Sequence, residues 1–176
     1  RLTDEGKQAS LVLGNNVLAQ VPDLNDFVGG VAILLSPRGT ATFEFPHLLR
    51  LLDEVQYDTI YHEHFSYFSF TTISLIIEKH GLAVYDVEEL ATHGGSLRVY
   101  AQHAGGPHAT SGEVAAMLAR EEASGLRTPE RYAQFADDVK TSKRRLLELL
   151  IRLRDQGKRV AGYGPPGKGN TLLNYC

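Results

Sequence analysis

Apolar residues near the start of the chain form first a strand-like and then a helix-like pattern. The short apolar run at residues 10–14 ends in Asn15 and Asn16, which predicts a buried strand with a polar pair at its carboxyl end. Pro22 and Asp23 favour a helix start, and apolar residues then recur at helical spacing as far as a turn expected at residues 36–39.

The pattern continues with further alternation of strands and helices. A strand is predicted at residues 40–45, followed by a short amphipathic segment at 46–54. Thr71 or Thr72 is expected to cap the next helix, and Gly81 stands where a glycine commonly follows a helix end.

Two alternating segments, residues 82–90 and 96–102, flank His93-Gly94-Gly95 and predict a β-hairpin. The succession predicts an α/β fold: the second half of a doubly wound parallel sheet that ends in this hairpin. Because ligands of such sheets bind beyond the carboxyl ends of the strands, Asn15, Asn16 and Glu44 are expected to face a cofactor crevice. His93-Gly94-Gly95 could equally be only a turn.

Gly105-Gly106-Pro107 marks a break, after which the pattern predicts helices at residues 111–124 and 128–156. Residues 159–163 are interpreted as a short strand leading into a glycine-rich turn, with a helix only beginning where the sequence stops. These patterns divide the chain into residues 1–104, a helical linker at 105–157, and the start of a second α/β domain at 158–176.

Composition excludes several classes of function. A net charge of −3 gives no general attraction to nucleic acid or to an anionic membrane surface. The one cysteine, Cys176, excludes an internal disulfide and favours a reducing compartment, so a cytoplasmic location is expected. No apolar run approaches the length that crosses a bilayer, and no export signal is recognisable. The sequence leaves the oligomeric state open. Arg1 and the internal position of Met117 are interpreted as signs of an interior fragment.

The run Tyr61-His62-Glu63-His64 concentrates acid, base and phenol chemistry among aromatic residues. Such groups are costly to hold near a core unless proton transfer or binding requires them, so the run is a candidate active site. Two other interpretations remain open. His62 and His64 could be metal ligands, although no third ligand stands near them in the sequence, or the run could be purely structural.

Four glycines, Gly162, Gly164, Gly167 and Gly169, surround Lys168 near the end of the sequence. Backbone amides and a cation before a helix are typical of a diphosphate site, although a tight turn would also explain the glycines.

Several longer motifs then resemble one family, the S-adenosylmethionine-dependent sugar C-methyltransferases. They comprise residues 15–19, 21–24, 61–64, 93–100 and 162–175. Their order and number make the resemblance more specific than a single short pattern.

The resemblance implies a Rossmann-like methyltransferase domain with S-adenosylmethionine as co-substrate. It implies methylation of a nucleotide-linked 4-keto-deoxysugar at a carbon next to the ketone. His64 would take the base position, with Tyr61 and Glu63 as polar catalytic neighbours. No metal is needed for this step. An upstream zinc domain and a glycine-rich cofactor loop, usual in the family, are not in this sequence.

Residues that resemble the substrate side of the family are spread along the chain: Gln20, His93, Ser96, Arg98, Lys168 and Asn170. Gln20 departs from the family, because relatives carry histidine there and glutamine is not a base at neutral pH. This leaves two hypotheses: a sugar C-methyltransferase, or a non-catalytic nucleotide-sugar binding module with a decayed methyltransferase core.

Overall fold

The computed structural model describes residues 2, 4–164 and 166–176. Four strands form one sheet in the order β1 (Ala9–Asn15), β2 (Leu35–Pro46), β4 (Ser96–His103), β3 (Leu82–Leu90). β1 and β2 are parallel, whereas β4 lies between β2 and β3 and is antiparallel to both. The predicted α/β class and the β3–β4 hairpin are therefore confirmed.

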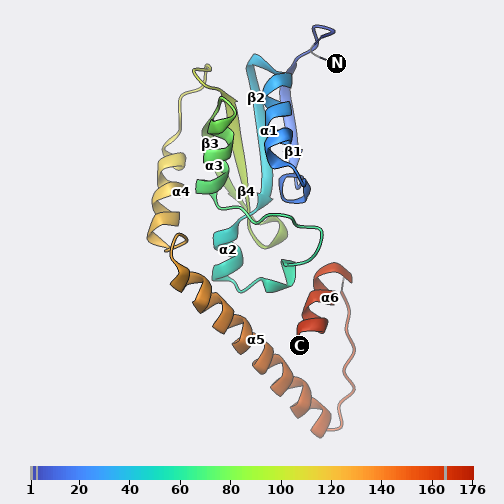
Figure 1. Cartoon of the computed structure of the whole chain (residues 1–176). Coiled ribbons are helices and arrows are strands. Elements are labelled where there is room, and N and C mark those ends of the chain that lie inside the picture. Colours follow the sequence, from blue (N-terminus) through green and yellow to red (C-terminus); the bar gives the residue numbers. More distant parts are fainter. Residues whose placement is uncertain (1, 3, 165) are drawn as a thin grey trace.

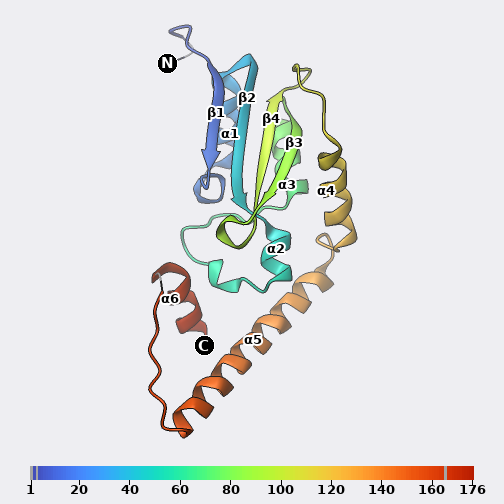
Figure 2. The ribbon, with the colours of Figure 1, turned by 180° about the vertical axis from the view of Figure 1, so that it is seen from behind.

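Two helices, α1 (Leu24–Leu34) and α3 (Phe70–Lys79), lie on the same face of the sheet (Figure 1). Seen from behind, no helix of the described residues crosses the other face (Figure 2). Strand alternation explains this asymmetry: Phe43 and Phe45 of β2 are fully buried with Val99 of β4, and they belong to the core that includes Val28 and Ile73 of the helices.

Helix ends follow local hydrogen-bond chemistry. The Asp23 side chain accepts a bond from the Asp26 amide and caps α1, as the sequence favours. At α3 the cap is Ser69, whose Oγ accepts from the Thr72 amide at 3.0 Å. The prediction of Thr71 or Thr72 as the cap is wrong because the backbone is already helical from Phe70. Gly81 follows this helix with φ +73°, as predicted.

β2 begins earlier than predicted. The expected turn at residues 36–39 is part of the strand, because Ala9 of β1 already pairs with Leu35. The register then shifts, so that Leu11 pairs with Thr40. Residues 36–39, where the turn was expected, thus form an irregular stretch within one long strand.

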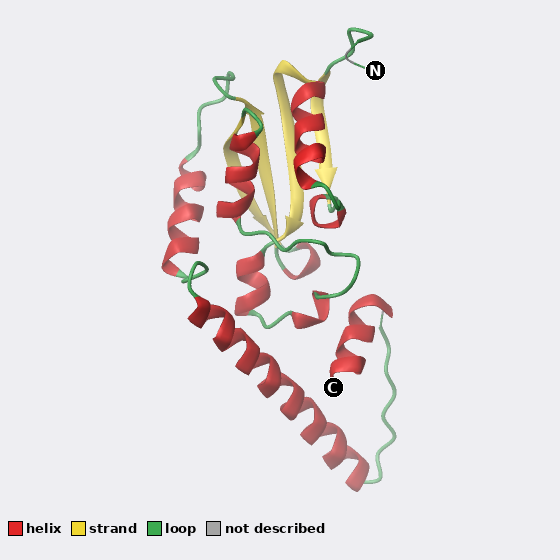
Figure 3. Cartoon of the chain, viewed as in Figure 1, coloured by secondary structure: helices red, strands yellow, loops and turns green. Residues whose placement is uncertain are grey.

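The remaining helices are α2 (Leu48–Asp53), α4 (Gly112–Ala123), α5 (Pro129–Asp155) and α6 (Pro166–Tyr175), with short 3₁₀ turns η1 (Leu18–Gln20), η2 (Tyr57–Thr59) and η3 (Thr92–Gly94) (Figure 3). The predicted helices at 111–124 and 128–156 are confirmed as α4 and α5. α5 leads away from the sheet, and the chain then returns so that α6 lies near the carboxyl ends of the parallel strands (Figure 1).

Residues 158–164 are not a strand, which corrects the prediction for 159–163. A strand needs hydrogen bonds from a neighbour, and no described segment provides them. The helix expected only to begin at the end of the sequence instead runs ten residues as α6. Pro165 of the glycine-rich turn lies outside the described residues. Among the described helices, none is long and apolar enough to cross a membrane.

Candidate active site

The acid–base run lies in a loop, residues 60–69, that joins η2 to α3; it is called the acid–base loop below. Backbone bonds fix the loop to neighbouring elements. The carbonyl of Ala19 in η1 accepts from the amides of Phe65 and Ser66, and the amide of Leu48 donates to the carbonyl of Phe68. The loop is thus held at its middle and near its end.

His64 is half-buried, and its Nδ1 lies 2.9 Å from the carbonyl oxygen of Thr59. Because a carbonyl can only accept, Nδ1 must carry the hydrogen. In a neutral ring Nε2 is then left with a free lone pair, which is the form a general base requires. The tautomer is therefore set by one backbone contact.

Aromatic rings enclose this histidine. Its ring centroid lies 4.7 Å from that of Tyr61 and 5.7 Å from that of Tyr67. The Tyr67 hydroxyl donates to the same Thr59 carbonyl, and burial raises the pKa of Tyr67, so this phenol stays protonated. Tyr61 carries no hydrogen bond from its hydroxyl to any described residue, so that group is free for a ligand.

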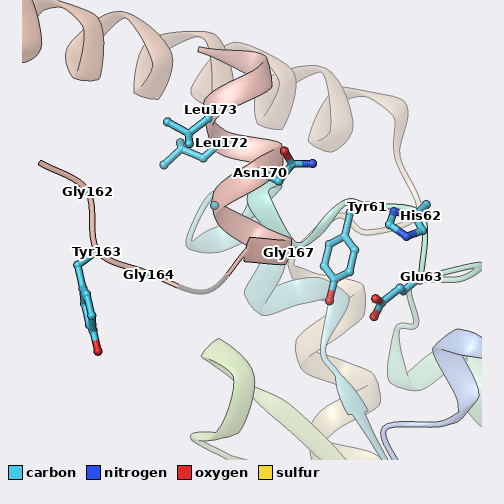
Figure 4. A pocket seen from close by; sticks show the side chains of 11 residues that line it. Tyr61, His62, Glu63, Gly162, Tyr163, Gly164, Gly167, Asn170, Leu172 and Leu173 are labelled. Atoms are coloured by element: carbon cyan, nitrogen blue, oxygen red, sulfur yellow. The ribbon is translucent and has the colours of Figure 1, made fainter.

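A pocket of about 830 Å³ lies between the acid–base loop and the returning C-terminal segment (Figure 4). Tyr61, His62 and Glu63 form one wall. The other wall is made by Gly162, Tyr163, Gly164, Gly167, Gly169, Asn170, Leu172 and Leu173. Two motifs about one hundred residues apart in the sequence thus line one cavity. His64 faces a separate small cavity with Ala19, Pro46, Thr59, Ser66, Tyr67 and Phe68.

α6 is packed directly against the elements that carry the acid–base run. A Cβ on Gly167 would lie 3.9 Å from the Tyr61 ring, and the rings of Tyr175 and Tyr57 are 5.3 Å apart. Burial, with the adjoining Cys176 thiol, raises the pKa of Tyr57 to about 12. Lys143 of α5 donates to the Tyr175 carbonyl and lies over its ring. These contacts place the second wall of the pocket.

Lys168 and Asn170 lie in the first two turns of α6. Asn170 lines the pocket, and its side-chain oxygen accepts from Asn174. Lys168 is half-buried beside the pocket rather than in its wall. Among the described residues no carboxylate pairs with it, so its charge is available to an anion.

Glu44 and Arg98 form an ion pair on the uncovered face of the sheet. Arg98 contacts Glu44 at 2.8 Å and Glu88 at 3.0 Å. The Arg98 bond is the main reason that the pKa of Glu44 is lowered. Glu44 is also buried and accepts from Thr92. The geometry therefore gives no support to the expected cofactor contact of Glu44 or phosphate contact of Arg98, because each satisfies the other.

The other predicted site residues of the sheet lie at its carboxyl end. Asn16 adopts a left-handed φ of +52°, and its side-chain amide is 3.4 Å from His93, while Asn15 is exposed beside them. Ser96 is 1% exposed and its hydroxyl donates to the Thr92 carbonyl, which closes the hairpin turn. Gln20 is exposed and directly follows Ala19, which anchors the acid–base loop.

Sequence reasoning missed Thr59, Tyr163, Leu172 and Leu173. Thr59 acts through its backbone carbonyl, which leaves no residue-type signal. Leu172 and Leu173 of α6 cannot be distinguished in the sequence from ordinary core residues, because their place in the pocket depends on how α6 packs. The described residues contain no group of three side chains placed to hold a metal ion.

The parallel strand pair, the inserted antiparallel strand and the candidate site beyond the strand ends define a Rossmann-like α/β domain. Residues 1–87 match a methyltransferase domain model, and residues 91–176 match the C-methyltransferase C-terminal domain model. The chain belongs to the S-adenosylmethionine-dependent C-methyltransferases.

Among curated proteins, the chain is 42% identical over 168 residues to the C-methyltransferase NovU of Streptomyces niveus. The match covers 96% of the chain but only 40% of that relative. Solved structures similar to the chain include magnesium protoporphyrin IX methyltransferase of Synechocystis with bound S-adenosylhomocysteine (14% identity, 59% of the chain and 49% of that structure, TM-score 0.44). A putative methyltransferase in complex with the Haloferax volcanii Trm112 activator is also similar (12% identity, 55% of each chain, TM-score 0.47).

Proposed function

We propose that this chain belongs to a cytoplasmic enzyme that methylates a nucleotide-linked 4-keto-deoxysugar at a carbon next to its ketone. The methyl donor would be S-adenosylmethionine. The observation that carries the proposal is His64, whose Nδ1 is committed to the Thr59 carbonyl and whose Nε2 is free as a base. The match to NovU, itself a C-methyltransferase, supports carbon as the methylated atom.

The chemistry assigned to the loop is formation and use of an enolate. Nε2 of His64 takes the proton from the carbon next to the ketone, and the electron pair of that C–H bond moves to form the enolate. The Tyr61 hydroxyl donates to the enolate oxygen, where negative charge develops. The enolate carbon then attacks the methyl carbon of the sulfonium, the carbon–sulfur bond breaks with its electrons going to sulfur, and the ketone is restored.

Glu63 is assigned to orienting the sugar, because its carboxylate lines the same pocket as Tyr61. The nucleotide end would lie against the opposite wall. Four glycines line that wall, Lys168 adds a positive charge beside it, and Leu172 with Leu173 offers an apolar surface. The dimensions of the pocket suit a ligand of nucleotide-sugar size.

A single experiment separates this function from the alternative of a non-catalytic binding module, which Gln20 in place of the family histidine favours. The full-length enzyme is incubated with a nucleotide-linked 4-keto-deoxysugar in deuterated buffer, without methyl donor, and deuterium at the carbons next to the ketone is followed by NMR. Enzyme-dependent exchange, followed by methyl transfer on addition of S-adenosylmethionine, supports the methyltransferase. Tight binding of the nucleotide sugar without exchange or transfer would support the binding module instead.

A further inference from the structure

We propose that Glu121 of α4 is a positioning residue for the acid–base loop, acting through the first turn of α3 and through His47. The inference rests on the proposed function, since it assumes that the loop carries the catalytic base. Glu121 lies about sixty residues after His64 in the sequence, within the segment that matches the C-terminal domain model. No contact with substrate is assigned to it.

The carboxylate of Glu121 is 1% exposed and is saturated by four donors. Oε1 accepts from Nε2 of His47 at 2.7 Å and from the amide of Phe70 at 2.6 Å. Oε2 accepts from the amide and the hydroxyl of Thr71, at 2.8 and 2.6 Å. A carboxylate buried in this way is stable only if such bonds compensate for its lost hydration, and here three of the four come from Phe70 and Thr71.

Phe70 and Thr71 stand at the junction between the acid–base loop and α3. Phe70 and Thr71 are the first two residues of α3, and their amides would otherwise lack a partner because helix starts leave such donors free. The negative charge also faces the positive end of the helix dipole. The ionised side chain of Glu121 therefore fixes the position at which the loop leaves the active site.

His47 extends this fixation to the sheet. Its backbone amide donates to the Gly95 carbonyl of the hairpin turn, and its neighbour Leu48 donates to the carbonyl of Phe68. The ring of His47 is fully buried, so its bond to Glu121 determines where the ring lies. Glu121 thus holds the end of the loop through α3, and His47 holds it through the start of α2. Ala19 separately anchors the middle of the loop.

Position matters here because a base must touch the proton that it removes, and small displacements of catalytic groups cost large factors in rate. Replacing Glu121 by glutamine keeps the volume of the side chain. It replaces one carboxylate oxygen by an NH₂ group, which cannot accept the bonds that this oxygen accepts now. We expect the loop end to move and His64 to be misplaced, while the pocket wall formed by α6 stays unchanged.

The test uses the full-length enzyme with Glu121→Gln and, as a matched control, Met117→Ala. Met117 is a buried apolar residue of the same helix, one turn before Glu121, and belongs to the main hydrophobic core without being one of the four donors. In Glu121→Gln, the rate of deuterium exchange at the sugar carbon should fall roughly tenfold or more, with the nucleotide-sugar KM within about twofold of wild type. Amide hydrogen exchange should rise in residues 60–71 and not in α1. Met117→Ala should lower Tm without either change.

Wild-type exchange rates in Glu121→Gln, or an equal loss in Met117→Ala, would overturn the positioning role. If Glu121→Gln does not fold, Thr71→Val removes only one donor and should still raise amide exchange in residues 60–71 relative to Met117→Ala; no rise would again overturn the proposal. A wild-type enzyme that shows no sugar exchange contradicts the proposed function instead, and the amide-exchange comparison then decides the positioning role by itself.

Discussion

At the scale of single residues, the chemistry proposed for the loop depends on a backbone atom. Many catalytic histidines are oriented by a carboxylate, which also stabilises the imidazolium that forms. Here the partner of Nδ1 is the neutral carbonyl of Thr59, which sets the tautomer without adding negative charge. His64 can therefore take a proton at Nε2, and the aromatic rings of Tyr61 and Tyr67 hold its plane.

The base assignment predicts that His64→Asn in the full-length enzyme lowers both sugar deuterium exchange and methyl transfer by about a hundredfold to ten-thousandfold. Asparagine keeps a hydrogen-bonding group but cannot accept the proton. The nucleotide-sugar Kd, measured by calorimetry, should stay close to wild type. His62→Asn is the matched control, since His62 neighbours the base and lines the large pocket instead. Loss of exchange in His62→Asn alone would assign the base to that residue.

A second prediction concerns the two cations that the sequence suggests as phosphate ligands. Arg98 is already paired with Glu44 and Glu88, whereas the described residues offer Lys168 no carboxylate. Lys168→Ala should therefore raise the nucleotide-sugar KM by roughly five- to a hundredfold, equivalent to about 1–3 kcal/mol for a charge-assisted contact. Steady-state kinetics should show an unchanged kcat. Lys158→Ala, in the exposed linker, serves as the control. An equal rise of KM in both variants would mean that the loss of any positive charge has this effect, and would contradict a specific role of Lys168.

At the scale of elements, the turn between β3 and β4 is held by close packing against α2. Gly95 has φ +113°, and a Cβ there would lie 2.9 Å from Cγ of Arg50. Gly95→Ala is thus expected to lower the free energy of unfolding by about 1–3 kcal/mol, from backbone strain and the clash. Urea denaturation measures it. Gly112→Ala, with open space around its Cβ position, should cost less than about 0.5 kcal/mol. Equal losses would contradict the packing argument.

The junction of α2, α3 and α4 makes a pH-dependent contribution to stability. Burial by itself would raise the pKa of Glu121, but hydrogen bonds from His47, Thr71 and Phe70 outweigh it, so the pKa lies below the ordinary value of 4.5. A lowered folded-state pKa means that the unfolded chain binds the proton more readily. This contribution is complete above about pH 5 and is lost as pH falls through the lowered pKa. Tm between pH 6 and pH 3 should therefore fall less steeply in Glu121→Gln than in wild type. Parallel curves would argue against an ionised buried Glu121.

At the scale of the whole molecule, the sequence predicts well those features that depend on local pattern, namely the strands and the helix ends. Alternating apolar residues define the strands, and Asp23, Pro129 and Gly81 mark helix ends, because these preferences act within a few residues. The cap at Ser69 was misassigned because three hydroxyl residues stand close together. The strand predicted at 159–163 does not form, because a strand needs a neighbouring strand to pair with and the local sequence does not reveal whether one is there. The sequence could not predict that the acid–base loop and α6 line the same pocket. That arrangement depends on the direction of α5 and on the return of the chain after it.

The whole chain also gives a prediction for S-adenosylmethionine. The glycine-rich cofactor loop that the family resemblance implies does not occur in these residues. Residues 1–176 expressed alone should therefore bind S-adenosylmethionine no more tightly than about millimolar, and should show no methyl transfer. Calorimetric titration is the measurement, with the full-length enzyme as the positive control. Micromolar binding by the isolated residues would contradict this expectation.

The position of β4 limits how such proteins can be recombined. The two family models divide the chain between residues 87 and 91, within or just after β3. Yet β4, from the second part, lies between β2 and β3 of the first and bonds to both. A chimera joined at this boundary would combine β4 from one parent with its neighbour β2, and most of its neighbour β3, from another. Hybrid enzymes should instead be joined after α4, so that all four strands of the sheet come from the same parent.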